Sequence, residues 1–230
     1  MLEFLAALVV FVLAHAVPAR PVLRGRLVDA LGRRTYLALY SALSLALLAW
    51  LISAAIRAPE IVLWQQARWQ AVLALISVPL ALLLIFAGLI KPNPLSVSLS
   101  TDGYDPARPG LLAITRHPVL WGFSLWGGVH IAVNGGLVGI ILFGALTFYA
   151  LFGTIALDRR KARTMGEAEW RRLAAHTANV PFIAILKGDA QPGIDPPLLA
   201  GIAASAIVSA ALLAGGHLWL FGADPLAFGR

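Results

Sequence analysis

The sequence predicts an all-α integral membrane protein: a polytopic bundle of about six transmembrane helices with one more helix at the cytosolic membrane surface. Of its 230 residues, 60% are hydrophobic and only 13% are charged, whereas soluble domains carry about 25% charged residues. The mean hydropathy is +0.82. The apolar residues also gather into stretches near the roughly 20 residues that a helix needs to cross a bilayer. Residues 1–230 are therefore expected to form a single integral membrane domain.

Six apolar stretches are the candidate spans. They are Leu2–Val17, Tyr36–Ile56, Val72–Ile90, Val119–Val133, Leu137–Leu157 and Leu198–Phe221. The fourth and fifth are separated only by Asn134-Gly135-Gly136, whose residue types favour a tight turn and predict a helical hairpin. Pro79 lies inside the third stretch and predicts a kink, because proline removes a backbone donor and clashes with the preceding turn.

The first stretch has a second interpretation. Its apolar run ends in Ala14-His15-Ala16, which resembles the small-residue cleavage site of a signal peptide. Signal peptides begin with a basic region, however, and this chain begins Met1-Leu2-Glu3. We expect the first stretch to be retained as a span.

The basic residues predict the orientation. Fifteen of the 18 lie in the loops after the first, third and fifth spans: Arg20, Arg24, Arg26, Arg33, Arg34, Lys91, Arg108, Arg116, Arg159, Arg160, Lys161, Arg163, Arg171, Arg172 and Lys187. Arg57, Arg68 and Arg230 lie on the other side. The positive-inside rule places the three loops in the cytosol and both termini in the periplasm of a bacterial inner membrane. Anionic lipid beside these loops accounts for the net charge of +7, and no nucleic-acid partner is expected.

The absence of cysteine limits the cross-links and the metal or haem sites that the chain can form. It excludes structural disulfides, thiolate ligation of haem or iron–sulfur clusters, and covalent attachment of c-type haem. After Glu3 no Asp or Glu lies within a predicted span, so a carboxylate-rich metal site in the membrane is disfavoured. Any metal or haem must be held by histidine or by oxygen.

A cytosolic segment near residue 170 has the pattern of an amphipathic helix. Its apolar face is formed, at spacings of three and four, by Trp170, Leu173, Ala174 and Thr177. Such a helix lies either in the membrane interface, with Trp170 at headgroup depth, or on the other cytosolic loops. The Val180-Pro181 pair should end it, because the residue before proline avoids the helical region.

The chain has five histidines: His15, His117, His130, His176 and His217. His176 lies in the basic cytosolic segment and is expected to be solvated, but the other four lie in or beside spans. An imidazole in the bilayer is costly unless it is coordinated or hydrogen-bonded. One such histidine is explained by a hydrogen bond to a neighbouring helix, whereas four together favour a ligand set. Two imidazoles on opposite sides of a porphyrin iron would make a b-type haem.

Five segments carry a resemblance to a known family: Ala14-His15, GRRTYLALYSALSL at 32 to 45, ITRHPVLWGFSLWGGVH at 114 to 130, DRRKARTMGEAEW at 158 to 170, and NVPFIAILKG at 179 to 188. Through them the chain resembles, nearly end to end, the NnrU family of bacterial membrane proteins, which shares its domain with the plant and cyanobacterial 15-cis-ζ-carotene isomerase. The most specific feature is TRHP followed by a second histidine thirteen residues later.

The resemblance implies a cofactor. In the isomerase branch two histidines hold a b-type haem, and residue by residue these fall on His15 and His130 as metal ligands. The NnrU branch is linked by its name to bacterial nitrite and nitric-oxide reduction. This implies denitrification-linked function or redox sensing, with a small hydrophobic or gaseous ligand, and haem-dependent carotenoid isomerisation as the alternative. Non-catalytic roles in electron transfer or in maturation of a reductase also fit a haem protein.

Depth in the predicted topology favours other pairs. His15 lies about four residues from the cytosolic end of the first span. His130 lies 13 residues beyond His117, which is roughly 20 Å toward the outer side at about 1.5 Å per residue. By depth, His15 pairs with His117 and His130 pairs with His217, so His117 and His217 stay open as haem-binding residues.

Arg116 is the other candidate cofactor contact. Its guanidinium suits a haem propionate, and the alternative is a side chain that reaches the cytosolic headgroups. Arg159 and Arg160, just past the end of the fifth span, are the next candidates for this contact, and in the alternative Asp158 is their local ion partner.

A second resemblance is to the isoprenylcysteine carboxyl methyltransferases. It rests on Arg-His-Pro, a later charged pair, Gly-x-x-x-Trp and Val-Pro. It implies S-adenosylmethionine at the cytosolic face, with His117 touching the cofactor and residues 166–182 closing over it. That family has paired glutamates where this chain has Asp158-Arg159-Arg160, a reversal of charge that weakens the implication.

Overall fold

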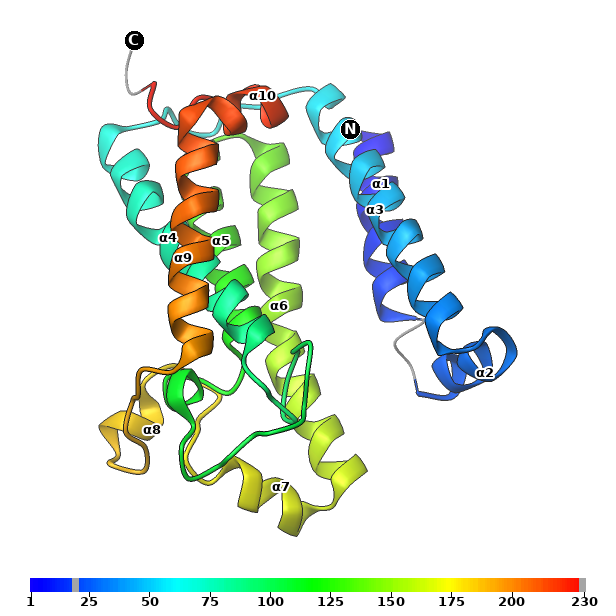
Figure 1. The fold of residues 1–230 in the computed structure, drawn as a ribbon. Helices are drawn as coiled ribbons and strands as arrows, with labels where there is room; N and C mark the ends of the chain where they lie inside the picture. Colours follow the sequence, from blue (N-terminus) through cyan, green and yellow to red (C-terminus); the bar gives the residue numbers. More distant parts are fainter. Residues whose placement is uncertain (18–20, 228–230) are drawn as a thin grey trace. The chain divides into compact units, whose positions relative to one another are not determined.

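The structure is a computed structural model that describes residues 1–17 and 21–227. In these ranges the regular elements are helices, and strand-like pairing is limited to an isolated bridge between Val62 and Gly136 (Figure 1). The predicted all-α class is confirmed. Two of the basic residues counted above, Arg20 and Arg230, lie outside the described residues. The chain divides into unit 1 (Met1–Leu63 with Gly136–Leu142) and unit 2 (Trp64–Gly135 with Phe143–Arg230).

Unit 1 is built on two packed helices. Its elements are α1 (Leu2–Ala16), α2 (Pro21–Leu31) and α3 (Arg33–Arg57). The contact between α1 and α3 buries Phe4 and Ala7 of α1 against a face of α3 that carries Leu51 and Ala54. The two alanines allow the helices to approach closely.

An ion pair joins the same two helices. Arg57 at the end of α3 donates to Glu3 in the first turn of α1 at 2.6 Å. Each charge also opposes the partial charge of its own helix end. The pair therefore stabilises the antiparallel arrangement of α1 and α3.

Unit 2 is built around α4. Its long helices are α4 (Arg68–Ile90), α5 (Pro118–Asn134), α6 (Leu137–Met165) and α9 (Pro196–Ala211). Helix α4 packs against both α5 and α9, and glycine makes each contact close. A Cβ at Gly122 of α5 would lie 2.7 Å from the carbonyl oxygen of Ala81, and one at Gly201 of α9 would lie 2.5 Å from Cβ of Ala87. Small residues are what helix contacts in membranes favour.

Four of the predicted spans have helices of sufficient length. Within the described residues, Arg33–Arg57, Arg68–Ile90, Leu137–Met165 and Pro196–Phe221 are long and apolar enough to cross a membrane. Helices α1 and α5 have 15 and 17 residues, fewer than the roughly 20 that a perpendicular crossing needs. Crossings by α1 and α5 stay predictions. The kink at Pro79 also stays a prediction, because α4 continues through this residue.

The fourth and fifth spans form the predicted hairpin. Helix α5 ends at Gly135, which has the left-handed φ of 62° that favours glycine, and α6 begins at Leu137. The predicted span Leu137–Leu157 lies within α6, which continues beyond it to Met165. The basic residues after Leu157 are good helix formers, and a helix that leaves the bilayer has no physical reason to stop at the headgroups.

The last span is broken near its outer end. The chain passes from α9 through a π turn, η2 (Leu212–Gly216), into the short helix α10 (His217–Phe221). Gly215 has a φ of 108° and ends the regular helix. The predicted span Leu198–Phe221 lies within the helical run Pro196–Phe221, which is long enough to cross a membrane and has this break near its end.

The connecting segments of unit 2 gather at the end opposite α10 (Figure 1). They include η1 (Gly110–Ala113), α7 (Glu167–Ala174) and α8 (Ile183–Leu186). A half-buried ion pair of 2.8 Å between Lys91 and Asp195 links two of these loops. The prediction that these two loops share one side is confirmed within unit 2.

The predicted amphipathic helix forms as α7 and lies on the other loops. Its apolar face turns inward, with Ala174 and Thr177 buried. Tyr104 of the preceding loop donates from its hydroxyl to the carbonyl of Leu173 at 3.0 Å. This contact favours the second of the two predicted placements. The regular helix ends at Ala174, earlier than the Val180-Pro181 pair indicated.

Candidate functional site

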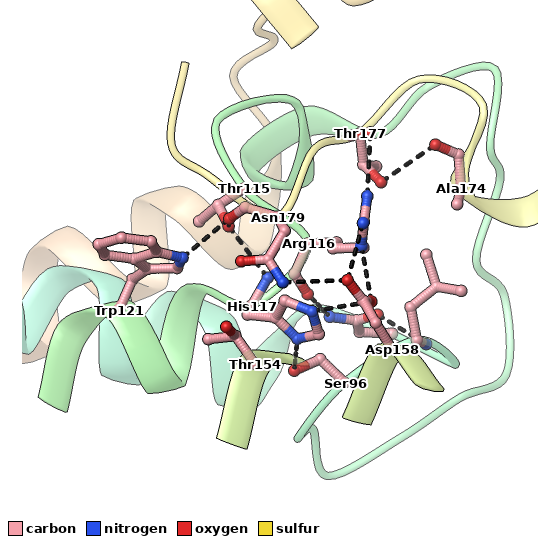
Figure 2. A network of polar contacts seen from close by, with 12 residues as sticks. Ser96, Thr115, Arg116, His117, Trp121, Thr154, Asp158, Ala174, Thr177 and Asn179 are labelled. Carbon is pink, nitrogen blue, oxygen red and sulfur yellow. Dashed lines mark hydrogen bonds and ion pairs between the residues drawn. The ribbon is translucent and has the colours of Figure 1, made fainter. Parts of the chain in front are cut away.

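The best-connected polar group of unit 2 is the carboxylate of Asp158, which follows the apolar part of α6. Its neighbours, here called the Asp158 network, come from three segments of the chain: Ser96, Arg116, His117, Thr177 and Asn179 (Figure 2). Arg116 and His117 immediately precede Pro118, the first residue of α5. Proline favours this first helical position and keeps the residue before it out of the helix. The two side chains are thereby directed at α6 from the start of α5.

Asp158 accepts four hydrogen bonds. Arg116 donates from Nε and Nη2, both at 2.8 Å, and His117 Nε2 and Asn179 Nδ2 each donate at 3.0 Å. The two bonds from Arg116 form the bidentate pair that charge-assisted hydrogen bonding favours. The predicted local pairing with Arg159 and Arg160 is thus replaced by a partner 42 residues away.

The histidine of the network is fully buried and has both ring nitrogens engaged. An ionised carboxylate only accepts hydrogen bonds, so Nε2 of His117 carries a proton. Nδ1 lies 2.8 Å from the hydroxyl of Ser96. His117 was a candidate haem or S-adenosylmethionine contact, and in this arrangement neither ring nitrogen is left for a ligand.

Further contacts surround the network. The carbonyl of Asn179 accepts from Thr115 at 2.6 Å and from the indole of Trp121 at 2.8 Å. The guanidinium of Arg116 lies 5.2 Å from the ring centre of Trp170 on α7, within the range of a cation–π contact. Arg116, predicted to reach a haem propionate or lipid headgroups, instead holds α5, α6 and α7 together.

The hydroxyl of Tyr104, which donates a hydrogen bond to Leu173 of α7, stays protonated. Burial raises the pKa of its hydroxyl to about 12, because the ionised form is disfavoured away from water. The hydrogen bond to Leu173 is therefore maintained at every physiological pH.

His130 has a different environment. Its Nδ1 lies 2.7 Å from the carbonyl of Trp126 on its own helix, and a carbonyl only accepts, so Nδ1 carries the proton. The rings of Trp126 and Phe143 lie 4.7 and 4.8 Å from the imidazole. Among the described residues, Nε2 has no hydrogen-bond partner.

His15 of unit 1 has the same local arrangement. Its Nδ1 lies 2.7 Å from the carbonyl of Phe11, four residues earlier. The rings of Phe11 and Tyr40 lie 4.2 and 5.9 Å away. In the described part of the chain its Nε2 also lacks a hydrogen-bond partner, so both predicted ligands present an unprotonated Nε2.

The two remaining histidines lie at opposite ends of unit 2. Nδ1 of His217, on α10, lies 2.7 Å from the carbonyl of Ala223. His176 is exposed, as predicted, with Nδ1 2.6 Å from the carbonyl of Asp189. His130 and His217 are the pair that predicted depth favoured.

Two residues of the Asp158 network were not predicted, and Asp158 itself was predicted only as a local ion partner. Ser96 and Asn179 have no pattern that distinguishes them from other loop residues. Asp158 had a usable signal, since it is the acidic residue closest to the end of an apolar span that follows TRHP. Within the described residues, no three His, Cys, Asp or Glu side chains are grouped so as to hold a metal ion.

Comparison with known proteins agrees with the resemblance. Residues 3–225 match the family described as NnrU protein. Among curated proteins, the chain is similar to the chloroplastic 15-cis-zeta-carotene isomerase of Arabidopsis thaliana, with 34% identity over 79 residues. These residues are 34% of this chain and 21% of the isomerase, so the match spans about a fifth of that relative. No solved structure matches the chain.

Proposed function

This chain belongs to the NnrU family of membrane proteins, and from that premise we propose that it binds a b-type haem through His15 and His130. One observation carries the proposal. Each ring donates its Nδ1 proton to the carbonyl four residues earlier and keeps an Nε2 with no partner among the described residues. His15 belongs to unit 1 and His130 to unit 2, and each ring has this arrangement within its own unit.

The arrangement of each ring suits a metal ligand. Metal-bound histidines normally donate their other nitrogen to a carbonyl or carboxylate, which fixes the tautomer and the ring orientation. A bare imidazole nitrogen among apolar side chains loses its hydration, and this cost favours a ligand at Nε2.

The ligand count also favours haem over a bare metal ion. A porphyrin supplies four nitrogens to its iron, so two imidazoles complete the coordination. The described residues contain no cluster of three or more metal-binding side chains, which a protein-only site would require. The rings of Phe11, Trp126 and Phe143 next to the two histidines offer flat apolar surfaces for a macrocycle.

A bound haem would supply redox chemistry or binding of a small gas. The residues of this chain would hold the iron axially, fix the ring orientation through the i−4 carbonyls and keep water away. We propose that the physiological ligand is nitric oxide or a related gas in denitrification or redox sensing. The alternative is isomerisation of a polyene, and the segment shared with 15-cis-zeta-carotene isomerase favours it. Methyl transfer is less favoured, because the polar groups of Arg116 and His117 are bonded within the Asp158 network.

The test is the haem content of the detergent-purified protein expressed with added haem precursor. The wild type should contain b-type haem, with oxidised and reduced spectra typical of two imidazole ligands. Haem should be lost in His130→Ala and reduced several-fold in His15→Ala, while the exposed His176→Ala retains the wild-type content. A wild type without haem would contradict the proposal, and binding of S-adenosylmethionine to that protein would support methyl transfer instead.

Two further measurements separate the proposed roles. Nitric oxide added to the reduced protein should shift the haem absorption if the ligand is a gas. A cis polyene incubated with the reduced protein should change isomer, as followed by its absorption spectrum, if the protein is an isomerase. A protein that does neither and is reduced and reoxidised reversibly would be assigned to electron transfer.

We also propose an orientation with the Asp158 network in the cytosol of a bacterial cell and both termini in the periplasm. The chain has no cysteine, so an introduced cysteine is the only residue of the protein that a thiol reagent can label. In intact cells a membrane-impermeant thiol reagent should label Gln65→Cys, which is exposed at the outer end of unit 2, and not Thr101→Cys, which is exposed in the cytosolic loop. The reverse labelling would invert the topology.

A further inference from the structure

We infer that the segment around α8, residues 180–194, is a membrane-interface anchor whose large apolar side chains insert into the bilayer leaflet at this end of unit 2. The partner is the lipid itself, at the boundary between headgroups and acyl chains. Haem binding is not needed for this role. The segment takes the interfacial position that was one of the two predicted for α7, which lies on the other loops instead.

Helix α8 turns its larger apolar side chains outward and a small one inward. Ile183 and Leu186, three residues apart, share one face of the turn, and both are exposed, Leu186 to 79%. The inward position is occupied by Ala184, which is buried against alanines of the neighbouring segments. A helix on a soluble surface has the opposite arrangement, with its large apolar residues against the core. The outward face of α8 therefore suits apolar surroundings.

The backbone at Phe182 holds an aromatic ring on the same surface. Its φ of 68° is left-handed, and no other non-glycine residue in the described ranges has a positive φ. The N–H of Phe182 donates to the carbonyl of Ile114 at 2.8 Å, which fixes this conformation. Glycine adopts such a φ freely, whereas a bulky residue rarely does. Because the phenyl ring is also exposed, the choice of phenylalanine indicates a gain from contact with something apolar.

The segment is fixed to the ends of two spans. Helix α8 packs on η1 through buried alanines, and η1 contacts α4. Helix α9 begins ten residues after α8 ends, and the ion pair between Lys91 and Asp195 joins the end of α4 to the start of α9. Both α4 and α9 belong to helical runs that are long and apolar enough to cross a membrane. The α8 segment therefore lies at the level of the bilayer surface (Figure 1).

The apolar surface continues along the chain into α9. Ile194, which directly precedes the ion-paired Asp195, is 81% exposed. Leu199, in the first turn of α9, is exposed as well. An apolar surface that leads without interruption into a membrane span is a surface that lipid covers. A second copy of the chain is the competing occupant, and the position beside two spans favours lipid.

The attraction to the bilayer is apolar and not electrostatic. The charged residues within 180–194 are Lys187 and Asp189, whose charges cancel. Both residues are exposed. Binding to anionic headgroups needs an excess of basic residues, so insertion of the apolar side chains is the interaction that this segment supports. It should therefore occur equally in zwitterionic and in anionic membranes.

The experiment measures the surroundings of single cysteines in the full chain. Leu186→Cys and Ile194→Cys are labelled with an environment-sensitive fluorophore and reconstituted into phosphatidylcholine vesicles. Arg171→Cys on α7 is the matched control, because its side chain is exposed to a similar extent, 74%. The labels at positions 186 and 194 should emit at shorter wavelength and be quenched several-fold by lipids with brominated acyl chains. The control label should emit as in water, without quenching.

Four outcomes would overturn the inference. Water-like, unquenched emission from positions 186 and 194 would show that the segment does not enter the bilayer. A shift to shorter wavelength that brominated lipid does not quench, and that grows with the protein-to-lipid ratio, would assign the surface to a second copy. Equal quenching of the Arg171→Cys label would remove the distinction between α8 and α7. Quenching that requires added anionic lipid would refute the apolar basis. If one of the two variants does not fold, the other decides.

Discussion

The two polar regions of this protein differ in one respect, which is whether their side chains satisfy one another. In the Asp158 network, the carboxylate accepts four hydrogen bonds, and the buried His117 has both ring nitrogens engaged. At His130 and His15, one nitrogen is bonded and the other has no partner among the described residues. A saturated network holds a structure together, whereas a bare nitrogen held in place is available for a ligand. Burial alone does not distinguish the two, since the most buried histidine is the one in the saturated network.

The largest effect is expected from Asp158→Asn. This change leaves the half-buried guanidinium of Arg116 without its ion partner, and breaking such a pair costs about 3–5 kcal/mol. Chemical unfolding of the detergent-solubilised protein should show this loss, while the exposed Asp102→Asn should leave the unfolding midpoint unchanged. Equal stability of the two variants would mean that the Asp158 network does not hold the connecting segments of unit 2 together.

A smaller effect, with a pH dependence, is expected from Tyr104→Phe. Removing the hydrogen bond to Leu173 should cost about 1 kcal/mol at neutral pH. Because burial raises the pKa of Tyr104 to about 12, above the roughly 10 of an unfolded chain, its neutral form stabilises the fold below pH 10. This contribution is lost as the pH rises from about 10 to 12. Unfolding measured between pH 8 and 11 should show a shallower decline for Tyr104→Phe, and identical slopes would refute the assignment.

His130→Phe should barely change the stability of the haem-free protein. A phenyl ring keeps the contacts with Trp126 and Phe143 and removes a nitrogen that has no partner, so the expected change is within about 0.5 kcal/mol. The same variant should bind no haem. His117→Phe is the matched change in the other region and should destabilise the protein strongly. Equal losses of stability for the two variants would show that the two histidines do not differ in how much their ring nitrogens stabilise the fold.

The smallest effect is expected on the outer face of α7. Arg172 pairs there with Glu169 at 2.7 Å, in full contact with solvent. Exposed ion pairs contribute little, because water and salt screen them. The thermal midpoint of Glu169→Gln should equal that of the wild type, and a clear decrease would show that α7 is held by its charges as well as by its buried face.

The sequence predicts what depends on local composition. The spans at Tyr36–Ile56 and Val72–Ile90 lie within helices α3 and α4 because apolar length between charged ends is a local property. Helix α6 continues beyond the predicted span because leaving the membrane and ending a helix are different events. The break before α10 had a local signal in Gly215-Gly216, which the surrounding apolar run obscured.

The candidate site also has contacts that the sequence predicts and contacts that it does not. The bond from each proposed ligand, His15 and His130, to the carbonyl four residues earlier follows from helix geometry, so its sequence signal is local. The pairing of Arg116 with Asp158 spans 42 residues and depends on how α5 and α6 pack, which composition does not encode. Ser96 and Asn179 are recruited by the same packing.

The order of residues in the Asp158 network has a consequence for biosynthesis. Arg116 and His117 are synthesised before Asp158, and Asn179 is synthesised last. The donors to the carboxylate therefore all precede α9 in the sequence. The Asp158 network can thus form without α9, whereas the Lys91–Asp195 ion pair, whose acidic member immediately precedes α9, needs the chain up to that helix.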